Sequence, residues 1–163
     1  MITQLSLKHR LTYDPLTGIF VWKNPAKYRL EYTGKRAGSL HAHGYIKISI
    51  DNLKYPAHRL AWLYVHGEFP IDCIDHINGI RNDNRIVNLR AVDRKANAEN
   101  RRKARAGHAT GFLGVVWRPR NGKYEARISV DKQYKYLGLF STPEEAHDAY
   151  LRAKRIHHTA CTI

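Results

Sequence analysis

The sequence predicts an α+β protein with a small N-terminal β-rich region, a central strand–loop–strand–helix unit, and a three-stranded antiparallel sheet packed on one helix. Two observations support this fold class. Short hydrophobic runs alternate with a period of two between turn residues, and only a few segments change to the helical period. The 163 residues suffice for one compact domain or two small ones. The linker-like composition of 107–111 predicts domains at 1–106 and 112–163.

The first 55 residues are expected to form short strands and turns. A strand-like run at 18–22 follows the turn at 14–18, and the segment 44–50 alternates strictly between apolar and polar residues. A hairpin turn at Asp51 and Asn52 leads into 53–55. The period then becomes helical over 57–66, and Gly67 suits the position just past the helix end.

The central region predicts two short strands that enclose a polar loop. We expect strands at 71–77 and 89–92, with a loop rich in Asn and Arg between them. Asp93 is a good cap for a helix over about 94–105, because Ala and Arg favour helices.

The last region predicts three strands and a helix. The strands are expected at 113–118, 124–130 and 134–140, with a hairpin turn between the first two. Thr142, Pro143 and Glu145 form a strong helix start: a capping hydroxyl, a proline in the first turn and a glutamate three residues after the threonine. The small residues of the following helix would let it lie close to a sheet.

The charge is strongly unbalanced, with 28 Lys and Arg against 14 Asp and Glu and a net charge of +14. The excess is spread along the chain: residues 1–70 carry a net +6, 71–110 a net +4 and 111–163 a net +4. A basic arm on a neutral domain is therefore excluded. Such a chain attracts polyanions, of which nucleic acid is the commonest and an anionic membrane surface is the other candidate.

Several classes are disfavoured by what the sequence lacks. No run of 18 apolar residues predicts a membrane span, and the first residues do not resemble a secretory signal. The two cysteines, Cys73 and Cys161, form no Cys-x-x-Cys pair, so a disulfide scaffold and a four-cysteine zinc site are not expected. These features predict a protein of the reducing cytosol.

Four residues of the central region have the chemistry for phosphodiester hydrolysis: Asp75, His76, Asn88 and Asn97. An aspartate and an asparagine supply the hard oxygen ligands that Mg²⁺ or Mn²⁺ prefers. An adjacent histidine can take a proton from the attacking water. A bound metal would stabilise the charge of the transition state and of the leaving oxygen.

The order of these residues resembles the HNH endonucleases, in the phage and homing branch that lacks structural zinc. The resemblance covers roughly residues 11–105 and rests on the segments 75–79, 81–90 and 96–100, with 58–61 upstream. It implies a ββα-metal unit, a divalent metal (Mg²⁺ before Mn²⁺) and no small-molecule cofactor.

The resemblance also implies a role for each residue. His76 would be the general base and Asp75 a metal ligand, and Asn88 would hold the loop that shapes the site. Asn97 would be the second ligand, at a place where the family often has histidine, and Asn100 is a weaker candidate for it. Successive strand residues point to opposite faces, so Asp75 and His76 can serve one site only if the strand ends or bulges there. His58 is expected to be structural and to bind backbone at the start of its helix.

The last region resembles the Apetala/ethylene-response-factor DNA-binding domain over about 50 residues. The resemblance rests on Gly114-Val115, Arg118-Pro119, Gly122-Lys123-Tyr124 and the stretch from Tyr136 to Tyr150. In that family a three-stranded sheet enters the major groove and the helix supports it. The implied DNA contacts are Arg118, Arg120, Lys123, Tyr124, Arg127 and Lys135. The plant pattern has Trp where this chain has Arg120, and Asn121 is an additional residue. Arg101 and Arg102, after the central helix, are read as phosphate contacts.

Together these features predict a site-preferring, homing-type DNA endonuclease that nicks double-stranded DNA. A phage or mobile element would encode it and a bacterial cytoplasm would contain it, as a monomer with no membrane partner. The alternative is a sequence-specific DNA-binding regulator whose HNH unit is inactive. A third hypothesis, that the chain is an RNA-binding or structural phage protein, accounts only for the charge.

Overall fold

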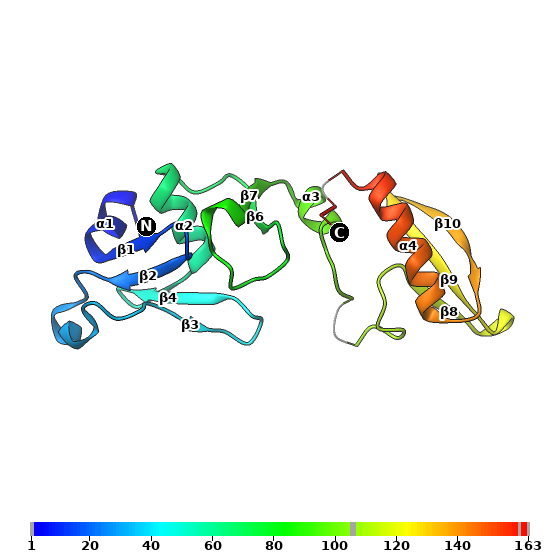
Figure 1. Ribbon diagram of the computed structural model, residues 1–163, viewed down its shortest axis with the longest axis horizontal. Helices are drawn as coiled ribbons and strands as arrows, with labels where there is room; N and C mark the ends of the chain where they lie inside the picture. Colours follow the sequence, from blue (N-terminus) through cyan, green and yellow to red (C-terminus); the bar gives the residue numbers. More distant parts are fainter. Residues whose placement is uncertain (1, 105–106, 160, 163) are drawn as a thin grey trace. The chain divides into compact units, whose positions relative to one another are not determined.

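The chain forms two compact units, Met1–Asp93 and Arg94–Ile163, in a computed structural model that describes residues 2–104, 107–159 and 161–162 (Figure 1). Both units combine small antiparallel sheets with a few helices, which confirms the predicted α+β class. The division at residue 93 lies before the linker expected at 107–111, so the boundaries inferred from composition remain a prediction. No helix among the described residues is long and apolar enough to cross a bilayer.

The first unit contains two helices, three antiparallel sheets and two 3-10 turns. The sheets are β1-β2, β3-β4-β5 and β6-β7. In chain order the elements are α1 (Gln4–Arg10), β1 (Leu11–Asp14), β2 (Ile19–Trp22), η1 (Lys27–Tyr32), β3 (Ser39–Leu40), β4 (Ile46–Ile50), β5 (Leu53–Pro56), α2 (Ala57–His66), β6 (Cys73–His76), η2 (Ile86–Asn88) and β7 (Leu89–Val92).

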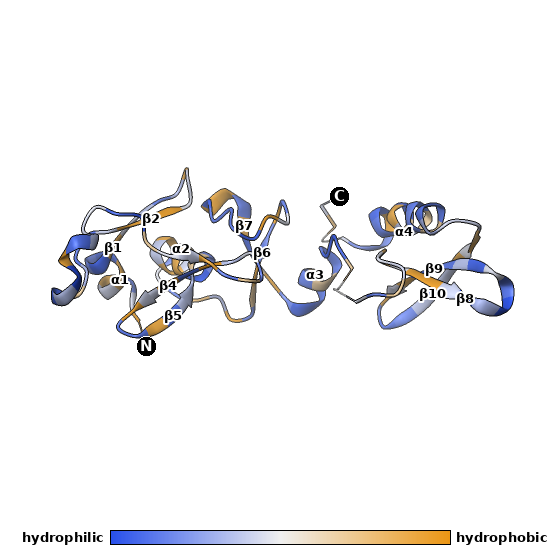
Figure 2. Cartoon of the chain, turned by 90° about the horizontal axis from the view of Figure 1, so that it is seen from below, coloured by the Kyte–Doolittle hydropathy of each residue, from blue (hydrophilic) through white to orange (hydrophobic). Residues whose placement is uncertain are grey.

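The core of this unit is formed by α1, α2, the β1-β2 hairpin and one face of the β3-β4-β5 sheet. Ile48 and Ile50 of β4 are buried, and so are Leu60 and Leu63 of α2, as their spacing predicts. The other face of β4 carries polar residues, and Figure 2 shows how hydrophobic and hydrophilic residues are distributed along the elements. Gly67 ends α2 in the left-handed conformation, with φ 87°, as predicted.

Turn chemistry fixes the hairpin register of this sheet. Asp51 and Asn52 both have positive φ, 48° and 63°, which is the requirement of a type I′ turn. The turn sets Ile50 opposite Leu53 and Ser49 opposite Lys54. The alternation seen in the sequence therefore becomes one apolar and one polar sheet face.

Five short elements of this unit were not anticipated from the sequence: α1, β1, η1, β3 and η2. Helix α1 begins at a capping box in which the Thr3 and Ser6 side chains each bind the other's backbone N–H, and it buries Leu7. A helix of seven residues presents too few apolar positions for its period to be recognised.

The second unit is a three-stranded antiparallel sheet, in the order β10-β9-β8, that packs on helix α4. Its elements are α3 (Arg94–Glu99), β8 (Val115–Arg118), η3 (Pro119–Asn121), β9 (Lys123–Val130), β10 (Gln133–Phe140) and α4 (Pro143–His157). The predicted capping box is present, because the Thr142 hydroxyl accepts from the Glu145 N–H and the Glu145 carboxylate accepts from the Thr142 N–H. A β-bulge shifts the register of β10 between Tyr136 and Gly138.

The helix predicted at 94–105 is shorter in the structure, where α3 ends at Glu99. Residue 105, its expected end, lies outside the described residues. The backbone carbonyl of Arg101 accepts from the buried Lys154 ammonium, and the Asn100 side chain accepts from the Thr162 hydroxyl. The first of these bonds engages a backbone carbonyl that a longer helix would pair, and the second fixes a side chain just after α3, so tertiary contacts oppose the helix propensity of the sequence here.

Candidate active site

Asp75 and His76 are the last two residues of β6 and are both buried, with exposures of 8% and 4%. The chain turns at residues 77–79, so the strand ends at His76. Opposite them on β7 lie Arg90, across from Asp75, and Leu89, across from His76. Strand β6 thus ends directly after the pair, and within the strand Asp75 and His76 both keep the regular register with β7.

His76 lies among other rings. Its Nε2 is 3.4 Å from the Asn84 Oδ1, and its ring centroid is 5.1 Å from that of His58 and 5.9 Å from that of Tyr45. Burial lowers the pKa of His76 below its ordinary 6.5, and the contact with Asn84 and the charge of Asp75 oppose the shift only in part. The imidazole is therefore neutral near pH 7, the state that a general base requires.

Asp75 forms an ion pair with Arg90. The Arg90 Nη2 and Nε donate to the Asp75 Oδ2 at 2.8 and 3.1 Å. Because the two residues are cross-strand partners, the hairpin itself holds this pair in place. The sequence pattern gave no reason to single out Arg90, since its partner depends on the strand register.

Asn88 joins both ends of the polar loop at 77–84. Its side-chain Oδ1 accepts from the Asn78 N–H at 2.9 Å, and its Nδ2 donates to the Asp83 carbonyl at 2.8 Å. Its own carbonyl accepts from the Ile77 N–H at 2.9 Å. One buried amide thereby fixes the entry and the exit of the loop that follows His76.

A second set of bonds stiffens the same loop through Asp83. Its carboxylate accepts from Arg85 at 2.6 and 2.8 Å and from the Asn78 amide at 2.7 Å. These hydrogen bonds, those from Arg85 above all, lower the pKa of Asp83 to about 2. The carboxylate is therefore ionised across the physiological range and keeps these hydrogen-bond donors.

The hairpin β1-β2 supports the loop from the outside. The Tyr13 hydroxyl donates to the Asn84 carbonyl at 2.7 Å, and the Ile86 N–H donates to the Pro15 carbonyl at 3.3 Å. Gly18, with φ +72°, lies so close that a Cβ there would be 2.5 Å from the Arg85 backbone nitrogen. The site-forming loop thus depends on residues more than 60 positions away in the sequence.

His58 belongs to the same cluster of rings. We expected it to bind backbone at the start of its helix, but its Nδ1 is buried and has no hydrogen-bond partner within the described part of the chain. Burial, with the positive charge of neighbouring groups as a smaller contribution, lowers the pKa of His58 to about 3. Its position next to His76 could not be inferred from its place on α2.

The remaining metal-ligand candidates lie in the second unit. Asn97 is exposed on α3, and Asn100 follows that helix and is buried, with its side chain bound to Thr162. Among the residues that the structure describes, no group of three or more His, Cys, Asp or Glu could hold a metal ion.

The predicted DNA contacts of the second unit divide between the two faces of its sheet. By strand register, Arg118, Lys123 and Arg127 lie on the face that is turned away from the buried Ala126 and Ile128. Arg120 is exposed in η3. Tyr124 and Lys135 follow the register of the opposite face, and Tyr124 packs 4.7 Å from Trp117.

Local contacts hold two of these arginines in place. Arg118 forms two bonds with Glu125, at 2.7 and 2.8 Å, and Arg127 lies over the Tyr134 ring at 4.7 Å. Arg102 donates to Thr162, to its carbonyl at 3.1 Å and its hydroxyl at 2.7 Å, whereas Arg101 is exposed. The Arg102 guanidinium is thus already engaged by the C-terminal segment.

Comparison with known proteins gives one family. Residues 55–99 match the family model described as HNH endonuclease, a segment that runs from β5 to α3 and includes Asp75, His76, Asn88 and Asn97. Neither the curated proteins nor the solved structures contain a match to this chain. The family match supports an HNH nuclease, with DNA as the substrate and a divalent metal as the usual requirement.

Proposed function

We propose that this protein is a site-preferring DNA endonuclease that nicks one strand by metal-dependent hydrolysis with His76 as the general base. The observation that supports the proposal best is a neutral, buried histidine at the end of β6, directly after a buried aspartate, inside the segment that matches the HNH family. A regulator with an inactive HNH unit would also match the family but would not need a neutral histidine that can accept a proton at this place.

His76 would accept a proton from the attacking water on Nδ1 or Nε2. The Asn84 amide beside Nε2 and the rings of His58 and Tyr45 limit the rotation of the imidazole. Asn88 keeps the adjoining loop in one shape, so the base is oriented before substrate arrives.

A divalent metal, Mg²⁺ or Mn²⁺, fits the donor chemistry at Asp75. The carboxylate is buried and supplies hard oxygen donors, and a metal ion bound there would have to share or replace the contact of Arg90 with Oδ2. The ion, when bound, supplies Lewis-acid stabilisation of the charge that develops on the phosphate and the leaving oxygen. Asn97 is the second candidate ligand on the strength of its place in the sequence motif.

The sheet of the second unit would supply the sequence preference, in the manner of an Apetala/ethylene-response-factor domain. Support comes from a sheet face that carries Arg118, Lys123 and Arg127, with α4 on the other side. Held arginines are suited to reading base edges because less freedom is lost on binding. Homing activity, encoding by a phage or mobile element, a bacterial cytoplasm and a monomeric state complete the proposal.

The experiment is a plasmid-nicking assay. Supercoiled DNA that carries the target, selected from a random library by binding, is incubated with the protein and Mg²⁺ or Mn²⁺. We expect open-circle product with 3′-hydroxyl and 5′-phosphate ends, and a loss of at least a hundredfold in His76→Ala. Asp75→Ala should lose activity as well, whereas His9→Ala, an exposed histidine of the same unit, should be unaffected.

The outcomes distinguish the nicking endonuclease from the DNA-binding regulator. No nicking with any divalent metal, by a folded protein that binds its target, would support the regulator instead. Equal nicking by His76→Ala and the parent chain would refute the assignment of the base.

A further inference from the structure

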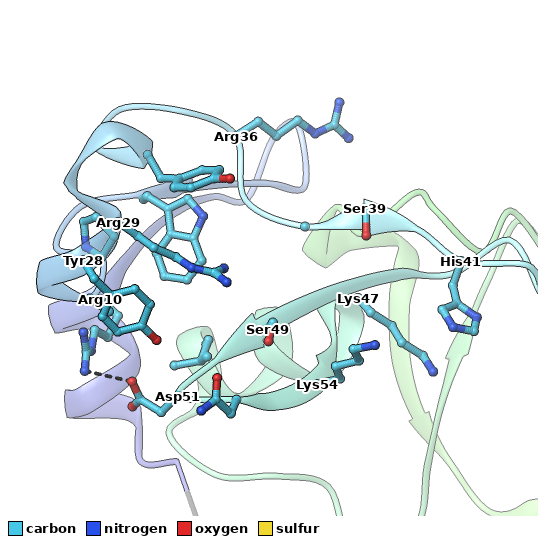
Figure 3. Close-up of a pocket in the computed structure, with 17 residues that line it drawn as sticks. Arg10, Tyr28, Arg29, Arg36, Ser39, His41, Lys47, Ser49, Asp51 and Lys54 are labelled. Carbon is cyan, nitrogen blue, oxygen red and sulfur yellow. Dashed lines mark hydrogen bonds and ion pairs between the residues drawn. The ribbon is translucent and has the colours of Figure 1, made fainter.

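A basic groove lies on the first unit, on the polar face of the β3-β4-β5 sheet and under η1 (Figure 3). It encloses a cavity of about 370 Å³. Five cationic side chains line it, with one carboxylate: Arg10, Arg29, Arg36, Lys47, Lys54 and Asp51. The carboxylate is paired with Arg10 at 3.0 Å, and the lining contains no other acidic side chain.

The strand register explains why these groups gather on one face. Lys47 and Ser49 alternate with the buried Ile48 and Ile50 of β4, and they lie opposite Ser39 of β3 and Lys54 of β5. Figure 3 shows Arg29 extending from η1 toward the sheet. Cations and hydroxyl donors on a rigid sheet are the groups that bind phosphodiester oxygens.

Strand β4 leads from the groove toward the candidate active site, whose residues do not themselves line the groove. Tyr45 precedes β4 and follows the same alternation as Lys47 and Ser49, and its ring is 5.9 Å from that of His76. The loop before it is tied to the active-site loop, because Arg81 donates to the His43 carbonyl at 2.9 Å and lies over the Tyr45 ring. With a rise of about 3.3 Å per residue, Ser49 lies about 13 Å along from Tyr45, a span of several phosphates.

We propose that this groove binds the phosphate backbone of duplex DNA and delivers one strand to His76. The proposal rests on the proposed function in taking DNA as the substrate. It assigns backbone binding to the first unit and leaves sequence preference to other surfaces, because phosphate contacts fix register without reading bases.

The test measures binding in EDTA, so that no cleavage takes part. A fluorescein-labelled 30-base-pair duplex of random sequence is titrated with the full chain at several salt concentrations. Each phosphate contact contributes about 0.9 to the slope of log K against log salt. We expect Lys47→Gln to lower the slope by about 0.9, and the triple variant Arg29→Gln, Lys47→Gln, Lys54→Gln to lower it by about 2–3 and to weaken binding at low salt at least tenfold.

The matched control is Lys8→Gln. Lys8 is an exposed lysine of the same unit, on α1, which packs on α2 rather than on the polar sheet face. This variant should keep the parent slope. The groove residues are at the surface, so thermal melting should give the parent midpoint for each variant. If the triple variant unfolds, the comparison of Lys47→Gln with Lys8→Gln still tests the proposal.

Equal slopes for Lys47→Gln and Lys8→Gln would overturn the proposal. A parent chain that never nicks but shows the expected slopes would keep the groove and refute the nuclease. If the parent chain nicks DNA but the triple variant binds as tightly as the parent, the nuclease is kept and the groove is refuted. Loss of binding to single-stranded RNA, with duplex DNA binding unchanged, would make the groove an RNA site and overturn the assignment to DNA.

Discussion

At the scale of single residues, the chemistry of this site depends on burial more than on charge. His76 has an aspartate beside it in the sequence, which by itself would favour the imidazolium, but the surrounding protein removes water and reverses the balance. The same environment places His58 against it and holds both rings neutral.

A pH profile of nicking tests this balance. If His76 is the general base, as we propose, nicking needs its neutral imidazole, so activity should be constant above the pKa of His76 and fall as pH decreases through it. Because burial lowers that pKa, the half-maximal point should lie below pH 6.5. The measurement is single-turnover nicking between pH 5 and 8 at saturating metal. A half-maximal point at or above 6.5 would show that the histidine is not desolvated as the structure implies.

Gly18 offers a second test at this scale. Alanine there must adopt φ +72° and place its Cβ 2.5 Å from the Arg85 backbone, whereas Gly34 has φ +78° and open space around it. Each substitution should cost about 1–2 kcal/mol for the left-handed backbone. Gly18→Ala should cost at least 1 kcal/mol more and should also reduce nicking, because it displaces the loop beside His76. Urea denaturation of both variants provides the comparison, and equal losses would contradict the close approach.

At the scale of elements, a single amide organises the loop between β6 and β7. Removing it in Asn88→Ala leaves the Asn78 N–H and the Asp83 carbonyl without these partners. We expect a loss of about 1–3 kcal/mol in the free energy of unfolding, together with slower nicking at unchanged DNA affinity.

The control for this prediction is Asn82→Ala, which changes an exposed asparagine of the same loop. Its stability should stay within about 0.5 kcal/mol of the parent. Similar losses in the two variants would mean that the loop tolerates the absence of the Asn88 bridge.

The elements differ in how far the sequence alone predicts them. Strands with strict alternation, such as β4, and helices with explicit caps, such as α4, were predicted closely, because their local signals agree with the packing. Short elements such as α1 and β3 were missed, since two to seven residues carry no readable period. The end of α3 depends on bonds from Lys154 and Thr162, which no local pattern contains.

The candidate site shows the same division. Asp75, His76 and Asn88 stand out by residue type and order, so the sequence was enough to single them out. Arg90, Asn84 and Tyr13 act through strand register and through contacts across long stretches of chain, so only the folded structure reveals them.

At the scale of the whole molecule, the buried histidines predict a loss of stability in mild acid. In the unfolded chain both would take up a proton near pH 6.5, while in the folded state their pKa values are lowered, that of His58 to about 3. Stability is therefore complete above pH 6.5 and decreases as pH falls, by up to about 1.4 kcal/mol per pH unit for each histidine. Asp83, with a pKa of about 2, adds its own loss only below about pH 4.

The measurement is the urea midpoint of the first unit's transition between pH 7.5 and 4.5. His58→Phe introduces a ring of similar size without a titratable group. It should reduce the dependence of the urea midpoint on pH by about half, because His76 still titrates. Arg59 and Tyr45 remain around the substituted ring. A midpoint independent of pH would show that the two rings are solvated.

The hairpin β1-β2 has a consequence for dividing this chain into parts. Residues 55–99 match the family model, yet the Tyr13 hydroxyl, the Pro15 carbonyl and the backbone at Gly18 contact the loop that follows His76. A fragment cut at residues 55 and 99 would lack these contacts. An excised domain of this chain should therefore include the N-terminal strands.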